Sequence, residues 1–242
     1  MGAETFDASF LATGLVWYVV FLLSLTLHEA GHAWAALKLG DPTAYLGGQV
    51  TMNPVPHVRR SPVGTVLVPI ASYLFGGWMI GWASAPYDPE WAWRHPKREA
   101  LMAAAGPAAN LLLMMVGWAT IRFGAMAGIF EPPAEIAGFD DLAVATVPWA
   151  EPLVPLASVL FALNLLLFVF NLLPLPPLDG SAIFPILFGE EGARKFKGML
   201  RATPALSLLG LVIAWNLFGP VFRPLYNFAL GTLYPGVSYG PG

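Results

Sequence analysis

The sequence predicts an all-α membrane protein: a polytopic bundle of about four to six membrane-spanning helices, with a small β-hairpin or re-entrant region after the first of them. Hydrophobic residues make up 57% of the 242 residues and charged residues only 11%, whereas about a quarter of the residues in soluble proteins are charged. Several apolar stretches reach the length of about 20 residues that a helix needs to cross a bilayer. Because no internal repeat divides the sequence, we expect residues 1–242 to form a single domain.

Five apolar stretches are candidates for spans. They cover residues 11–37, 62–85, 98–121, 153–173 and 204–222, with a short apolar tail at 224–233. We do not expect the first stretch to be a cleavable signal peptide, because Glu4 and Asp7 precede it instead of basic residues. Pro69, Gly76 and Gly77 interrupt the second stretch, so it either crosses the membrane once or dips in and returns.

The basic residues predict how these stretches are oriented. One topology places ten of the twelve Lys and Arg residues on the same side of the membrane, and the positive-inside rule makes that side the cytoplasm. This topology requires the 62–85 stretch to be re-entrant, because basic residues flank it at both ends. The ten residues are Lys38, Arg59, Arg60, Arg94, Lys97, Arg98, Arg194, Lys195, Lys197 and Arg201.

The sequence His28-Glu29-Ala30-Gly31-His32 lies near the C-terminal end of the first stretch and places ionisable side chains at membrane depth. A charged side chain there costs roughly 2.5 to 3.5 kcal/mol, so such groups are usually retained for a partner or a reaction. On a helix, His28 and His32 share one face, where their imidazoles can hold one metal ion. Glu29 projects beside that pair, which suits a general base acting on water.

A catalytic zinc site usually has three protein ligands, so a third ligand is expected. The chain contains no cysteine, which restricts the choice to nitrogen and oxygen. Asp179 is the candidate, because it follows the fourth stretch in a proline-rich segment that cannot stay helical. Gly180 then permits a close turn after the acid. The alternative is that Asp179 caps a following helix.

These motifs together resemble the site-2 proteases, zinc metalloproteases that cut inside membranes. The resemblance rests on His-Glu-x-x-His in an apolar helix and, roughly 150 residues later, on Asn-x-x-Pro-x-Pro-x-Leu-Asp-Gly at residues 171–180. Residues 106–110 are similar to the Gly-Pro-x-x-Asn element of that family. Residues 52–57 and the 64–69 run resemble a compact bacterial and archaeal branch without PDZ or CBS domains. The resemblance covers residues 15–190 approximately.

The resemblance implies a set of site residues. One Zn²⁺ per chain would bind to His28, His32 and Asp179, with Glu29 as general base and acid.

Three further polar residues keep alternatives open. By the resemblance, Asn171 and Asn110 lie near the metal, where a side-chain amide holds substrate backbone or the developing oxyanion. The alternative for both is hydrogen bonding between helices. His57 is expected to be a surface residue near the headgroups, with a contact to the metal site or to substrate as the other possibility.

The implied function is that of a zinc-dependent intramembrane endopeptidase in a bacterial or archaeal plasma membrane, with its active site toward the cytoplasm. The expected partners are the lipid bilayer and a membrane-protein substrate with a transmembrane segment. A net charge of −3 and the lack of a basic face argue against nucleic acid. The alternatives are a membrane metal-binding or transport protein without protease activity and a catalytically inactive scaffold. No pattern indicates an oligomeric state.

The segment 45–52 is short, rich in glycine and weakly alternating. We expect it to form an exposed β edge, because proteases commonly bind substrate in an extended form that adds to such an edge. The alternative is a surface hairpin without a role in substrate binding.

Overall fold

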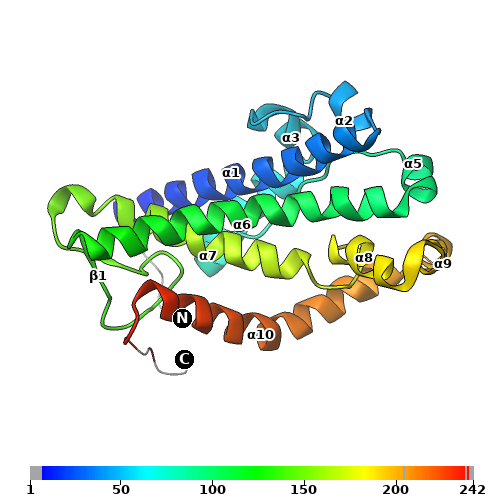
Figure 1. Cartoon of the computed structure of the whole chain (residues 1–242). Coiled ribbons are helices and arrows are strands. Elements are labelled where there is room, and N and C mark those ends of the chain that lie inside the picture. The colour runs from blue at the N-terminus through cyan, green and yellow to red at the C-terminus, as the bar shows by residue number, and fades with distance from the viewer. Residues whose placement is uncertain (1–6, 204, 238, 240–242) are drawn as a thin grey trace.

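The computed structural model describes residues 7–203, 205–237 and 239, which form an elongated bundle of helices (Figure 1). Within this part of the chain, four helical segments are long and apolar enough to cross a membrane. They contain α1 (Ala8–Leu39), α6 (Pro96–Met126), α7 (Leu153–Asn171) and α10 (Ala205–Leu233). The predicted polytopic, all-α membrane fold is therefore confirmed.

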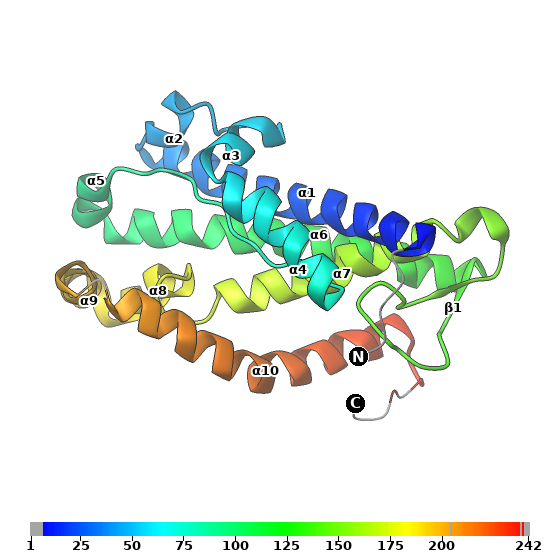
Figure 2. The ribbon, with the colours of Figure 1, turned by 180° about the vertical axis from the view of Figure 1, so that it is seen from behind.

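The second apolar stretch folds back on itself, as a re-entrant segment would. One turn of π-helix (Val63–Leu67) and α4 (Val68–Gly76) run inward, and Gly77 reverses the chain with a φ of 73°. The chain then returns in an extended conformation beside the helix that it has left (Figure 2). The backbone N–H of Trp82 donates to the carbonyl of Gly64 at 3.1 Å. The two ends of the stretch thus lie on the same side of the bundle.

The prediction of a β edge at 45–52 is wrong. The structure has a short helix, α2 (Thr43–Leu46), followed by turns and by α3 (Pro54–Arg60). The cause is Asp41, which is 1% exposed. Its Oδ1 accepts hydrogen bonds from the backbone N–H (2.9 Å) and the hydroxyl (2.5 Å) of Thr43, which starts a helical turn.

The small β-sheet lies at the opposite end of the bundle. It consists of β1 (Phe130–Glu131) and β2 (Val144–Ala145), which pair antiparallel with Phe130 opposite Ala145. The last apolar stretch and its tail form one helix, because Pro220 and Pro224 lie inside α10 without ending it.

The helices α1, α6 and α7 form the centre of the bundle and approach one another through glycines. A Cβ at Gly31 of α1 would lie 2.8 Å from the carbonyl oxygen of Ala105 in α6. A Cβ at Gly117 of α6 would lie 2.5 Å from the backbone nitrogen of Phe161 in α7. Small residues at such contacts let helix backbones approach closely. Polar side chains of the three helices are consequently brought within hydrogen-bonding reach.

The elements that carry the ten basic residues lie at one end of the bundle (Figure 1). These elements are the C-terminal end of α1, α3, the N-terminal end of α6 and two further helices, α5 (Pro89–Arg94) and α9 (Gly189–Ala202). The short α8 (Gly180–Ile183) and a 3₁₀ turn (Phe184–Phe188) connect α7 to α9. The β-sheet lies at the other end.

Candidate metal centre

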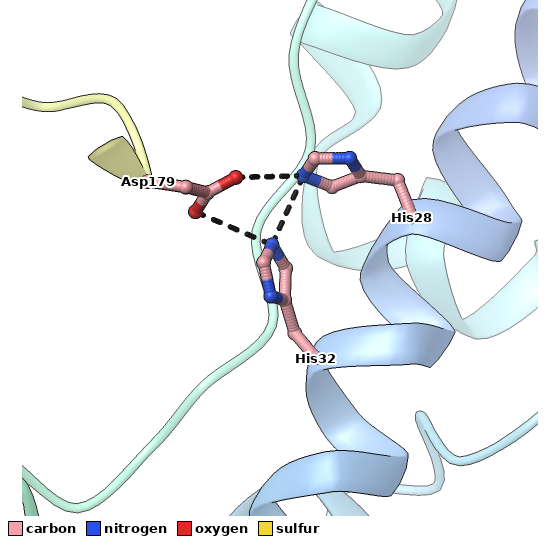
Figure 3. A group of neighbouring side chains, drawn as sticks. All are labelled: His28, His32 and Asp179. Carbon is pink, nitrogen blue, oxygen red and sulfur yellow. Dashed lines mark hydrogen bonds and ion pairs between the residues drawn. The ribbon is translucent and has the colours of Figure 1, made fainter. Parts of the chain in front are cut away.

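The three residues expected to bind a metal lie together (Figure 3). His28 and His32 project from adjacent turns of α1, and Asp179 reaches them from the segment between α7 and α8. The Nε2 atoms of the two histidines are 3.0 Å apart. Asp179 Oδ2 lies 3.2 Å from His28 Nε2, and Asp179 Oδ1 lies 3.3 Å from His32 Nε2.

These distances fit a single small metal ion. Ligand atoms bound tetrahedrally to zinc at about 2.0 to 2.1 Å are separated from one another by about 3.3 Å. Two imidazole nitrogens and one carboxylate oxygen are also a donor set that zinc accepts, with a fourth position left open. The residues present therefore fit the metal that the sequence predicts.

Hydrogen bonds turn both imidazoles so that Nε2 faces Asp179. The Nδ1 of His32 lies 2.9 Å from the carbonyl oxygen of Met102, which can only accept a hydrogen bond. The Nδ1 of His28 lies 2.6 Å from Oδ1 of Asn110. With the protons on Nδ1, both Nε2 atoms keep their lone pairs for a metal.

The chain between α7 and α8 folds back on itself to present Asp179. A Cβ at Gly180 would collide with the carbonyl oxygens of Leu172 and Leu173, so only glycine fits at this position. Asp179 precedes α8, but its side chain makes no capping hydrogen bond. The alternative of a simple helix cap therefore finds no support.

A cavity of about 870 Å³ opens beside the three residues. Glu29 lines it and is 5% exposed, but it is not part of the group of three converging ligand atoms. Asn171 also lines the cavity. One N–H of its amide donates to the carbonyl of Leu167 at 3.0 Å, which leaves the second N–H for another acceptor.

Asn110 and His57 differ from what the sequence suggests. Asn110 is fully buried and does not line the cavity; it contacts the ring of His28. The structure thus favours a supporting role over direct contact with substrate. His57 is 2% exposed rather than a surface residue, and its Nε2 lies 3.1 Å from the carbonyl oxygen of Thr51. It closes the loop before α3.

An ion pair lines the end of the cavity near the basic residues, and the sequence alone does not indicate it. Lys197 of α9 contacts the carboxylate of Glu99 of α6, and both side chains are largely buried. Burial lowers the pKa of the Lys197 ammonium, and the facing carboxylate opposes this shift. Arg201 also holds α9 in place, because its guanidinium donates to the carbonyl of Pro89 at 2.7 Å.

The fold and the site define a class: a polytopic helical membrane protein with a His-His-Asp group at the wall of an internal cavity. The chain belongs to peptidase family M50, whose family model matches residues 16–215. This match confirms the resemblance seen in the motifs.

Two relatives show how far the similarity extends. YwhC of Bacillus subtilis, whose name describes a candidate zinc metalloprotease, is 34% identical over 166 residues, which is 68% of this chain and 65% of that protein. Rip2 of Mycobacterium tuberculosis, named in the same way, is 32% identical over 163 residues, which is 67% of this chain and 53% of that protein. The chain thus spans less than two thirds of the length of these relatives. No solved structure matches it significantly.

Proposed function

We propose that this protein is a zinc-dependent endopeptidase that cuts transmembrane segments of other membrane proteins. The observation that carries the proposal is the convergence of His28 Nε2, His32 Nε2 and the Asp179 carboxylate beside a cavity that Glu29 also lines. Family membership and the names of the relatives support the same activity. Nothing in the fold or in the relatives favours the alternative of a metal transporter.

Each residue of the site has a chemical role in this proposal. His28, His32 and Asp179 would hold the zinc ion, which polarises a carbonyl and lowers the pKa of water when bound. Glu29 accepts a proton from water and returns it to the leaving amine. Asn171 donates its free amide N–H to the oxygen of the scissile carbonyl as negative charge develops there.

The location of the site supports a substrate inside the membrane. His28 and His32 lie in the C-terminal half of α1, a helix long and apolar enough to cross a membrane, and the C-terminal end of α1 lies at the end of the bundle that carries the basic residues. The positive-inside rule makes that end cytoplasmic. We therefore place the protein in the plasma membrane with its active site toward the cytoplasm, and we take residues 1–242 as one domain.

The segment that would hold the substrate is 81–87, not 45–52. Residues 81–87 form neither helix nor strand and line the cavity. Among the described residues, the backbone–backbone hydrogen bonds of this segment are limited to the one from Trp82 to Gly64. Its remaining backbone groups suit an extended substrate that adds as a neighbouring strand. A helical substrate would have to unwind to bind there.

The test compares zinc content with cleavage in purified protein. Glu29→Gln should keep zinc near the wild-type level and lose cleavage of a transmembrane model substrate, because the base is removed and the ligands remain. His32→Ala and Asp179→Ala should lose both. Full cleavage by Glu29→Gln would overturn the proposed hydrolytic role, and full zinc content in His32→Ala would overturn the ligand set.

A further inference from the structure

A row of buried polar side chains leads away from His28 through three helices. Oδ1 of Asn110 in α6 lies 2.6 Å from His28 Nδ1. Nδ2 of Asn110 donates to Oδ1 of Asn164 in α7 at 2.9 Å. Nδ2 of Asn164 donates to the hydroxyl of Ser24 in α1 at 2.9 Å. The two asparagines and Ser24 are all 0% exposed.

Main-chain carbonyls fix the direction of this row. The hydroxyl of Ser24 donates to the carbonyl of Val20 at 2.7 Å, and Nδ2 of Asn164 also donates to the carbonyl of Leu160 at 2.8 Å. Because a carbonyl only accepts, the amide nitrogen of Asn164 must lie on that side, and its oxygen must face Asn110.

The same logic continues to the histidine. Asn110 places its NH₂ group toward the oxygen of Asn164 and its own oxygen toward His28. An oxygen at this position accepts a hydrogen bond from Nδ1–H, so the lone pair of the neutral ring is on Nε2. Figure 3 shows this Nε2 facing Asp179, with Nδ1 on the far side of the ring.

We propose that Asn164, supported by Ser24, is a positioning residue that holds His28 in the tautomer that binds metal. The inference rests on the proposed role of His28 as a zinc ligand. A rotation of the Asn110 amide by 180° would turn an N–H toward His28 Nδ1 and favour the proton on Nε2. Asn164 opposes this rotation, because its oxygen would then face the oxygen of Asn110 in a site without water to compensate.

His32 provides an internal control. Its Nδ1 faces the main-chain carbonyl of Met102, so its tautomer does not depend on any side-chain amide. A substitution in the row should therefore change the tautomer of His28 and leave that of His32 as it is. General loss of structure would change both.

The experiment measures tautomers and zinc affinity, not cleavage. Zinc-free protein with ¹⁵N-labelled histidine would be studied by NMR, and zinc affinity would be measured by competition with a chelator. The chain contains only four histidines, which makes assignment by single substitution practical.

Asn164→Leu should give His28 a mixture of tautomers and weaken zinc binding about 10-fold, the low end for residues that support a metal ligand. Ser24→Ala should act in the same direction more weakly, because Asn164 keeps Leu160 as a partner. Asn164→Asp should restore the Nδ1–H form, because it keeps an acceptor for Asn110.

Two matched controls should leave both measurements unchanged. Asn216→Leu removes an asparagine of the candidate span α10, whose amide hydrogen bonding within the described part of the chain is confined to that helix, to the carbonyl of Val212. Ser158→Ala removes a fully buried serine of α7 that accepts from the backbone N–H of Leu142, away from the metal centre.

The outcomes separate this inference from the proposed function. If Asn164→Leu keeps the wild-type tautomer and zinc affinity, the positioning role is wrong. If Asn164→Leu does not fold, Asn164→Asp provides the test. Finding His28 of that variant in the Nε2–H form would also show that the positioning role is wrong. If His28→Ala binds zinc as tightly as wild type, the ligand role itself fails.

Discussion

Gly106 of α6 lies against His32 so closely that a Cβ at position 106 would collide with the imidazole Nε2. The same Cβ would lie 2.6 Å from Nε2 of His28. The bare backbone of Gly106 therefore forms one wall of the space that the two metal-facing nitrogens share. This gives a physical reason for the first residue of the Gly-Pro-x-x-Asn element.

We expect Gly106→Ala to lower zinc affinity by more than 10-fold, because the added methyl group must push at least one imidazole away from Asp179. Chelator competition on the purified protein measures this. Gly124→Ala is the matched control, since Gly124 lies in the same helix as Gly106 but near its other end, where an added Cβ would collide with the ring of Phe130 in β1 and not with a histidine. It should reduce thermal stability and leave zinc affinity unchanged. Equal zinc affinities for both variants would contradict the steric argument.

The re-entrant stretch predicts a labelling pattern in membranes. The chain has no cysteine, so Ser61→Cys and Ser84→Cys would each carry a single thiol. Arg60 Nε donates to the hydroxyl of Ser84 at 3.4 Å, which places the two ends of the stretch together. Both thiols should react with an impermeant reagent from the cytoplasmic side, and Glu135→Cys should react from the opposite side. If Ser84→Cys were labelled from the same side of the membrane as Glu135→Cys, the re-entrant topology would be contradicted.

The ion pair between Glu99 and Lys197 predicts a strong dependence of stability on both partners. The two side chains are 9% and 19% exposed. Lys197→Met leaves a buried carboxylate without a partner, which should cost about 3 kcal/mol. Adding Glu99→Gln should recover most of that loss, as measured by thermal unfolding in detergent. Lys195→Met, which breaks an exposed pair with Glu191, should change stability by less than about 1 kcal/mol. Additive losses in the double variant would rule out direct coupling.

The spans and the converging residues could be predicted from the sequence because each leaves a local signal. An apolar run of fixed length defines a span, and two histidines four residues apart define one face of a helix. Asp179 could be predicted as the third ligand because prolines before it and Gly180 after it mark a tight turn. The sequence left open whether the 62–85 stretch spans or returns, and the fold-back in the structure agrees with the basic residues on both sides of it.

The features that the sequence did not predict depend on distant partners. Asp41 starts α2 through Thr43, but it also accepts from the backbone N–H of Asp88, 47 residues later in the chain. Asn164 bonds residues that are 54 and 140 positions away. Nothing in the local pattern around such residues distinguishes a buried network from an ordinary polar side chain. The glycines of 45–52 consequently suggested a hairpin that Asp41 prevents.

The last prediction concerns how a substrate reaches the metal centre. A stable transmembrane helix keeps its carbonyls bonded and has no water to compensate their exposure, so opening it costs several kcal/mol per unpaired group. Gly or Pro in the cytoplasmic half of a model substrate span should therefore raise its cleavage rate, and a Leu-rich replacement should lower it.

Ala83→Pro in the enzyme should reduce cleavage at unchanged zinc content, because it removes a backbone donor from the segment 81–87 that lines the cavity. Val50→Pro is the matched control, since Val50 lies in the loop before α3 and does not line the cavity. Cleavage that is indifferent to both the helix stability of the substrate and Ala83→Pro would show that strand addition at 81–87 is not part of the mechanism, whereas the roles of Glu29 and the metal ligands would stand.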